Sequence, residues 1–274
     1  MGRNVQVVFQ TRYSFFGSSG WRSEASKTAE ILFDPARLSR RLDLFRRMTL
    51  ACLRDQTDPD FRLVVLTSTR LPEDHLARLT EACSDILGAG RAQVIPRAPG
   101  SAGQWLRRYM HRHMADVPHS AQVVLDDDDA LSVDFVERTR TEAEFALTAM
   151  APGQDCVYLS WASGLTARFN PDGGVDLMPR EVPFTNLGLT LVAPTMTSRN
   201  PYMLAHKKVA RRHAVRVFHD QRPWYLRAVH DLNDSRAMHG DDPLPRAAVE
   251  AVLDRFPLLR DMDLVALRAA RAAE

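Results

Sequence analysis

Short apolar runs alternate with amphipathic stretches through the first half of the chain, and this alternation constrains the fold most strongly. Apolar runs at residues 5–9, 61–68, 92–97 and 121–125 have the length of buried strands. The intervening stretches that carry apolar side chains at helical spacing are 35–54, 71–83 and 101–114. Strands separated by helices predict a mostly parallel sheet with helices on both faces.

Capping signals place two of the expected helix starts. Asp34 is expected to cap a helix that begins at Pro35, because the missing N–H of proline costs nothing in the first helical turn. After the strand at 121–125, Ser132 is expected to cap a helix through residues 132–150.

The second half of the chain has a different pattern. Its strand-like runs are 156–163, 165–169, 174–178, 187–192, 213–218 and 224–230, and helical patterns at 245–256 and 261–273 close the chain. The sequence NPDGG at 170–174 predicts a hairpin turn. We expect one domain over 1–274, composed of a nucleotide-binding half (1–150) and a smaller β-rich half with C-terminal helices (151–274).

Composition narrows the class of protein. The 274 residues carry a net charge of +2 with a pI near 8.5, which gives no indication of a nucleic-acid partner. Cys52, Cys83 and Cys156 lie far apart without metal-ligand spacing, as is typical of reduced cysteines. Neither a signal peptide nor a spanning segment is indicated, and the predicted location is cytoplasmic.

Four adjacent carboxylates end the strand at 121–125. In VVLDDDDALS, Asp126, Asp127, Asp128 and Asp129 follow directly on the apolar run. Ligands of such sheets bind beyond the carboxyl ends of the strands. The four charges require a cation or many donors, and Mg²⁺ or Mn²⁺ takes one or two carboxylates together with phosphate oxygens. The alternatives are a solvated acidic turn, or Asp129 as a helix cap whose acidic neighbours have no role.

The same block carries a resemblance. VVLDDDDALS resembles the D-x-D region of GT-A glycosyltransferases, and further segments are similar to the putative rhamnosyltransferase family. Those segments are TRYSFFG, LFDPARLSRRLDLFRRMTLACLRDQTDPDFRLVVLTSTRLP, NLGLTLV and PWYLRAVHDLN, which cover most of residues 9–235. The combination of QTDPDFRLVVLTS with DDDDAL is specific, whereas D-x-D alone is weak.

The resemblance implies an α/β, GT-A (Rossmann-like) fold with a mixed, mostly parallel sheet flanked by helices, and residues 151–274 on the acceptor side. It implies metal-dependent transfer of a sugar, rhamnose in the family's name, from a nucleoside-diphosphate donor to a hydroxyl of a glycan, lipid or small molecule. It places Asp126 and Asp127 on the donor side, and Asp128 and Asp129 at a Mn²⁺ or Mg²⁺ ion.

Five further residues are candidates for donor binding. Arg12, after the first strand, either binds a phosphate of the donor or is a surface arginine. Thr67, at the end of the second strand, either bonds the base or ribose or caps a turn. Gly103, before a helix, allows close approach to an anion, with Arg107 and Arg108 one turn later. The alternative for the two arginines is a solvated basic helix face.

Late histidines and aspartates complete the predicted site. His230 matches the family's late histidine, which the resemblance places at the metal or diphosphate. Asp220 is the candidate base for the acceptor hydroxyl, although a structural role is the alternative for both residues. Asp231 stands where the family usually has glycine or a small polar residue.

Two other functions fit the sequence less well. A nucleotidyltransferase shares the fold and metal use but normally has a Gly-rich loop with Arg or Lys after the first strand, which YSFFGSSGWR matches poorly. A non-catalytic cation-binding module predicts no nucleotide affinity. The amphipathic pattern at 261–273 either contacts an anionic membrane that carries lipid-linked acceptors or packs on the domain.

Overall fold

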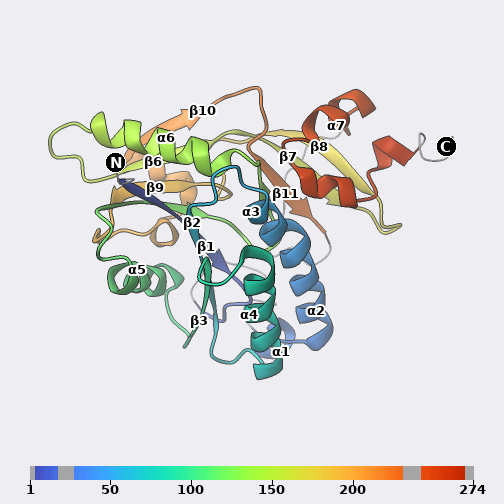
Figure 1. Cartoon of the computed structure of the whole chain (residues 1–274), viewed down its shortest axis with the longest axis horizontal. Helices are drawn as coiled ribbons and strands as arrows, with labels where there is room; N and C mark the ends of the chain where they lie inside the picture. The colour runs from blue at the N-terminus through green and yellow to red at the C-terminus, as the bar shows by residue number, and fades with distance from the viewer. Residues whose placement is uncertain (1–3, 18–27, 231–241, 269–274) are drawn as a thin grey trace.

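The computed structural model describes residues 4–17, 28–230 and 242–268. Within them, strands form a seven-stranded sheet of order β10-β6-β9-β4-β1-β2-β3 and a four-stranded sheet of order β5-β11-β7-β8 (Figure 1). The strands are β1 (Val5–Arg12), β2 (Phe61–Ser68), β3 (Ala92–Arg97), β4 (His119–Val124), β5 (Ala130–Leu131), β6 (Val157–Trp161), β7 (Ser163–Phe169), β8 (Val175–Glu181), β9 (Thr190–Pro194), β10 (Ala214–Phe218) and β11 (Tyr225–Val229).

Helices cover both faces of the larger sheet. The α-helices are α1 (Ala29–Leu32), α2 (Pro35–Leu44), α3 (Ala51–Arg54), α4 (Glu73–Leu87), α5 (Ala102–His113), α6 (Phe135–Thr148) and α7 (Arg246–Val252). A π-helix, η1 (Phe45–Leu50), joins α2 to α3. The 3-10 helices are η2 (Pro201–Met203), η3 (His206–Arg211), η4 (Pro257–Asp261) and η5 (Val265–Leu267).

The larger sheet is mixed and mostly parallel, as the sequence predicts. Strands β3, β2, β1 and β4 are mutually parallel, and β9 is antiparallel to both β4 and β6. Because β10 is parallel to β6, the strands β4, β6 and β10 run in the same direction. Three strands from the second half of the chain therefore extend the sheet begun by the first half.

Alternate residues of the strands face two different layers. Val7 and Phe9 of β1 face the main core, into which α2, η1, α3, α4 and α6 insert apolar side chains. Val8, between them, faces the opposite side and packs against α5. On that second side, Leu191 and Tyr158 of the neighbouring strands pack against Val209 of η3. Thus α5 and η3 cover the same face of the sheet.

The helix predicted at 35–54 forms with one irregularity. Asp34 caps its start as predicted, since its side chain accepts a hydrogen bond of 2.8 Å from the Arg37 amide. The middle of the stretch, η1, is a π-helix, and its wider turn changes the direction in which the side chains project. The pattern of apolar residues gave no sign of this change.

The predicted cap at Ser132 is wrong. Helix α6 begins at Phe135, and the residue before it is Asp134. The Ser132 amide instead donates to the Trp224 carbonyl oxygen at 3.0 Å, which holds this residue extended beside β11. Its hydroxyl donates to an Asp134 carboxylate oxygen at 2.8 Å.

The predicted hairpin at 170–174 is confirmed. It joins antiparallel β7 and β8, and Gly173 adopts a φ of 87°, which favours glycine. Helix α7 lies within the predicted 245–256, whereas the described part of 261–273 contains the short η5 and residues 269–273 lie outside the described ranges. Within the described residues, no helix has the length and apolar character that crossing a membrane requires.

A buried amide network joins the second face of the sheet to η2. Gln10 of β1 donates to Gln122 of β4 at 3.1 Å, and the Asn200 amide donates to the side-chain oxygens of both, at 2.9 and 3.1 Å. The Asn200 side-chain oxygen accepts from the Tyr202 backbone amide at 3.0 Å, and the Tyr202 hydroxyl donates to the Gln10 backbone carbonyl at 2.7 Å. This network fixes Tyr202 against the end of β1.

Asn200→Ala is expected to lower the free energy of unfolding by about 2 kcal/mol, because it leaves buried amides without partners. Urea denaturation measures the loss. Gln104→Ala, which removes an exposed amide from α5, is the matched control and should change stability by less than about 0.5 kcal/mol. Equal effects of the two substitutions would show that the network does not stabilise this face.

Candidate functional site

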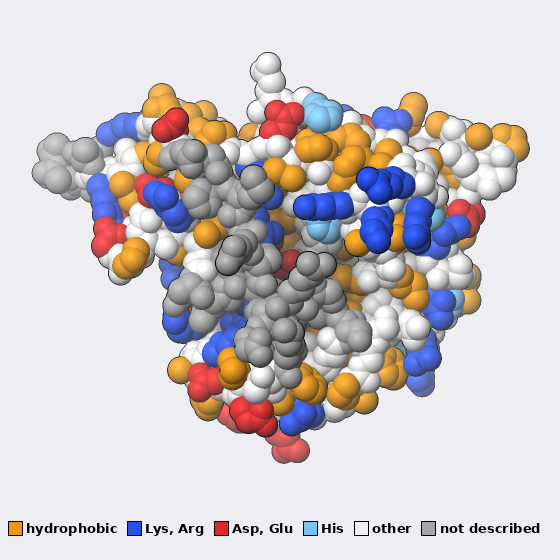
Figure 2. Space-filling model, turned by 180° about the vertical axis from the view of Figure 1, so that it is seen from behind, with side chains coloured by type: hydrophobic (Ala, Val, Ile, Leu, Met, Phe, Trp, Pro, Cys, Tyr) orange, Lys and Arg blue, Asp and Glu red, His pale blue; other side chains and the backbone are white. Residues whose placement is uncertain are grey.

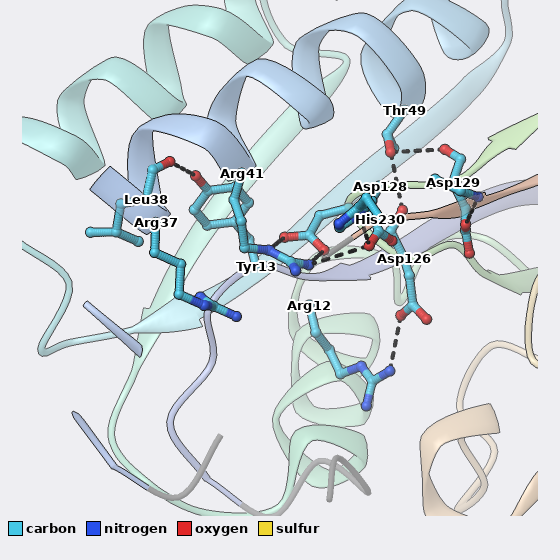
Figure 3. A network of polar contacts seen from close by, with 12 residues as sticks. Arg12, Tyr13, Arg37, Leu38, Arg41, Thr49, Asp126, Asp128, Asp129 and His230 are labelled. Atoms are coloured by element: carbon cyan, nitrogen blue, oxygen red, sulfur yellow. Dashed lines mark hydrogen bonds and ion pairs between the residues drawn. The ribbon is translucent and has the colours of Figure 1, made fainter. Parts of the chain in front are cut away.

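Residues 126–129, here called the aspartate turn, lie between β4 and β5 at the carboxyl end of the parallel strands (Figure 3). The strand that follows the turn, β5, pairs antiparallel with β11, and Leu226 lies opposite Ala130. Pairing in this register brings the end of β11 alongside the turn. The last described residue after β11, His230, is thereby delivered to the aspartates from a distant part of the sequence.

Three contacts join β11 and the residue after it to the turn. One carboxylate oxygen of Asp129 accepts a hydrogen bond of 2.9 Å from the Ala228 amide. The His230 Nε2 lies 3.1 Å from an Asp128 carboxylate oxygen. Asp129 is 2% exposed and also lies 3.9 Å from the guanidinium of Arg227. Asp129 therefore holds β11 in place, whereas Asp128 and His230 face each other.

Arg12 connects β1 to the aspartate turn. Its Nη2 donates to an Asp126 carboxylate oxygen at 2.9 Å. The guanidinium lies over the Tyr202 ring, 4.5 Å from its centroid, so the amide network positions Arg12 through Tyr202. The Asp126 side chain is 23% exposed, whereas that of Arg12 is 4% exposed. Arg12 is thus buried and oriented rather than a mobile surface arginine.

Helix α2 and the π-helix support the turn from the other side. Arg41 forms two hydrogen bonds with the Asp127 carboxylate, one of them at 3.1 Å, and lies 3.9 Å from Asp128. In η1, the Thr49 hydroxyl lies 3.1 Å from the Asp126 carbonyl and 2.9 Å from the Asp129 carbonyl. The wide π turn therefore brings a hydroxyl to both ends of the aspartate turn.

The pKa values of the buried carboxylates diverge. Burial raises the pKa of Asp127 to about 6, against the influence of Arg41 and with a contribution from Asp128. Burial also acts to raise the pKa of Asp128, but the hydrogen bond with His230 and the charges of Arg41 and Arg227 outweigh it and lower the pKa to about 2. Burial and the charge of Asp128 raise the pKa of Asp129. Asp128 therefore remains ionised at neutral pH.

The donor set fits a hard cation only in part. No group of three or more His, Cys, Asp or Glu side chains that could hold a metal ion is found in the described ranges. Asp128 and His230 supply one carboxylate and one imidazole that already face each other. Mg²⁺ sites commonly use one or two carboxylates and complete their coordination with substrate phosphates and water. The pair fits such a shared site.

The other predicted donor residues do not lie in the turn. Gly103 packs closely on η2, since a Cβ there would lie 2.7 Å from Met203 Cγ. Arg107 donates to the Ser198 carbonyl at 3.1 Å, and Arg108 lies over the Trp105 ring. Gly103 and Arg107 join α5 to its neighbours, whereas Arg108 packs on a ring of its own helix, and the donor-binding role of all three stays a prediction.

Thr67 and Asp220 also lie apart from the turn. Thr67 is buried at the end of β2, and its hydroxyl has no hydrogen-bond partner among the described residues. The Asp220 carboxylate accepts from Trp224 Nε1 at 2.8 Å. It follows β10, which is three strand spacings, roughly 14 Å, from β4 at the same edge of the sheet. Their predicted roles in base recognition and catalysis remain untested.

Sequence reasoning missed Arg41, Thr49, Tyr202 and Arg227. A signal existed for Arg41, which stands beside Leu38 and Leu42 on the apolar stripe of its helix, where a charged residue needs a partner. The position of Thr49 depends on the π-helix, and that of Arg227 on the pairing of β11 with β5. No local pattern indicates either.

Family comparison identifies the class of protein. The sequence matches the family described as "Putative rhamnosyl transferase" over residues 6–242, and the chain belongs to this family. It is a glycosyltransferase of the nucleotide-sugar type, as the resemblance of its motifs implies. The match spans every residue of the aspartate turn and His230. A comparison with curated proteins gives no match.

Solved structures with a similar arrangement are distant. A putative nucleotide-diphospho-sugar transferase from Desulfovibrio desulfuricans G20 is 14% identical, with a TM-score of 0.37, over 84% of this chain and 83% of that one. S. aureus TarS is 11% identical, with a TM-score of 0.39, over 82% of this chain. The matched region is 36% of TarS, so this chain spans about a third of that protein.

Arg41→Met is expected to lower the free energy of unfolding by about 3 kcal/mol, because it leaves Asp127 buried without its cation. The double variant Arg41→Met/Asp127→Leu should recover more than half of this loss, since both charges are then absent. Chemical denaturation at neutral pH measures both. Arg46→Met, an exposed arginine of η1, is the control and should be nearly neutral. Additive losses in the double variant would contradict the pairing.

Proposed function

We propose that the protein transfers a sugar, rhamnose in the name of its family, from a nucleoside-diphosphate donor to a hydroxyl group in a metal-dependent reaction. The observation that carries this proposal is the pairing of Asp128 with His230 at the carboxyl end of the sheet, between Arg12 and Arg41. The acceptor is a glycan, a lipid or a small molecule. Family membership favours this function over a nucleotidyltransferase or a non-catalytic module.

The charge balance of the turn bears on how the donor binds. Four carboxylates lie against three arginines and one histidine, so much of the negative charge of the turn is compensated before any ligand arrives. A diphosphate alone adds negative charge beside the aspartates, and a divalent cation alone adds positive charge beside the arginines. When the diphosphate and the cation bind together, their opposite charges largely cancel. Metal and nucleotide are therefore expected to bind as a pair.

Each group then has a separate part in the reaction. Asp128 and His230 hold Mn²⁺ or Mg²⁺, which when bound neutralises charge on the departing diphosphate. Arg12 is placed to exchange its contact with Asp126 for a donor phosphate, because the Tyr202 ring fixes its guanidinium plane. Asp126 is then free to accept hydrogen bonds from sugar or ribose hydroxyls. A carboxylate base, Asp220 in our proposal, removes the acceptor proton.

A cytoplasmic location and a glycan or lipid-linked acceptor complete the proposal. A peripheral membrane contact through 261–273 is part of the same proposal. The structure describes residues 261–268 of this stretch. There, Leu264 is buried against the core, which favours packing of this part on the domain. Asp231, where the family pattern differs, lies outside the described residues.

Nucleoside diphosphates are expected to bind roughly tenfold or more tightly with Mn²⁺ than in EDTA, and Mn²⁺ should gain the same factor from the nucleotide. Calorimetry with UDP, GDP and dTDP measures both couplings. Asp128→Asn should abolish the coupling. Asp116→Asn is the control, because Asp116 is exposed and precedes the amino end of β4, and this variant should preserve the coupling. Equal affinity with Mn²⁺ and in EDTA would remove the metal from the proposal.

His230→Ala is expected to weaken nucleoside-diphosphate binding in Mn²⁺ and to lower turnover together, because it removes a ligand of the shared site. Asp220→Asn should spare donor binding and lower only the rate of transfer, as befits a base that acts on the acceptor. His219→Ala is the matched control, since this exposed histidine pairs with Glu181 instead. Unchanged transfer by Asp220→Asn would assign the base to another residue.

A further inference from the structure

Basic residues are segregated in two stretches of the sequence. Residues 86–115 contain five arginines and no Asp or Glu, and residues 182–219 contain four arginines and two lysines and again no Asp or Glu. The whole chain is nearly balanced, with 36 basic and 34 acidic residues. Such long acid-free stretches therefore create a local excess of positive charge.

The fold brings the two stretches together. Helix α5, from the first stretch, and η2 and η3, from the second, cover the same face of the larger sheet. Arg107 donates to the Ser198 carbonyl at 3.1 Å, and a ring nitrogen of His111 lies 2.8 Å from the Thr197 carbonyl oxygen. Two sequence-distant charge excesses therefore form one surface.

Six exposed side chains define this surface, here called the basic face. They are Arg108, Arg112, Lys207, Lys208, Arg211 and Arg212. Within the described part of the chain, none of them forms an ion pair, whereas nearby Arg199 and Arg216 pair with Asp155 and Glu142. Viewed from behind, the molecule shows Lys and Arg side chains gathered on one part of its surface (Figure 2). Their charge is available to a partner.

Exposed apolar side chains adjoin the basic face. Met196 is 55% exposed and Met203 is 40% exposed, and both belong to the segment that contacts α5. They are two of four large hydrophobic residues that are exposed in the described ranges. Basic residues beside flexible apolar ones suit the interface of an anionic bilayer, where charges meet headgroups and apolar groups enter the acyl boundary. Single-stranded nucleic acid would instead require exposed aromatic rings for stacking.

We propose that the basic face docks the enzyme on a membrane of anionic phospholipids. The face adjoins the site, because Met203 follows Tyr202, whose ring lies against Arg12. Docking through α5 and η3 would hold the rim of the site beside the bilayer. The proposal goes beyond sugar transfer and requires neither donor nor metal, so each can fail without the other.

Vesicle sedimentation tests the docking without any nucleotide. The protein should bind phosphatidylcholine vesicles that contain phosphatidylglycerol, bind pure phosphatidylcholine far more weakly, and dissociate as salt is raised. Each basic side chain near an anionic surface contributes roughly fivefold to partitioning. The variant Arg112→Gln/Lys207→Gln/Lys208→Gln/Arg211→Gln should therefore bind roughly several hundredfold more weakly. Met196→Ser should cause a smaller loss that persists at raised salt.

A charge-matched control separates docking from net charge. Arg46→Gln/Arg47→Gln/Arg54→Gln/Arg78→Gln removes four exposed arginines from η1, α3 and α4 and should retain binding within a few-fold. Equal losses in the two variants, or equal binding to both kinds of vesicle, would overturn the proposal. So would retention by a heparin or oligonucleotide column, lost in the first variant, without binding to anionic vesicles.

Discussion

Each carboxylate of the aspartate turn lies against a basic side chain that is distant from the turn in the sequence. The pairs are Asp126 with Arg12, Asp127 with Arg41, Asp128 with His230, and Asp129 with Arg227. Four adjacent carboxylates would otherwise repel one another in a buried position. The partners come from β1, α2 and β11, so the turn can form only where these elements meet. The relative positions of β1, α2 and β11 therefore determine whether the four pairs can form.

Two structural features make the pairing geometrically feasible. The π-helix η1 directs Thr49 to the backbone at both ends of the turn, and π turns inside helices often occur at functional sites. The short strand β5 recruits β11, which connects the smaller sheet to the larger one at the site. A buried amide network on the opposite side positions Tyr202 and, through it, Arg12. The site is therefore preorganised from three directions.

Local sequence patterns predicted much of the fold and only part of the site. The cap at Asp34, the hairpin at 170–174 and the order of strands and helices follow from turn chemistry and apolar periodicity. Arg12, which ends β1, and His230, which follows β11, both contact the aspartates, and their roles in binding stay predictions. The cation partners of Asp127 and Asp129 depend on long-range pairing, which periodicity does not encode. The cap at Ser132 failed for the same reason, since β11 competes for its amide.

The divergent pKa values give the turn a division of roles. Asp128 stays charged at neutral pH because its pKa is lowered, whereas burial raises the pKa values of Asp127 and Asp129. The sequence left two ways to compensate the aspartates, a cation or many donors, and the described residues supply donors from β1, α2 and β11. A metal enters this account as the partner of the donor diphosphate.

A crystal structure of the protein with Mn²⁺ and a nucleoside diphosphate tests the central claim most directly. The account predicts a metal bound to Asp128 and His230, a diphosphate that bridges this metal and Arg12, and Asp127 still paired with Arg41. A nucleotide bound away from the aspartate turn, or a diphosphate bound there with no metal between it and Asp128, would contradict it.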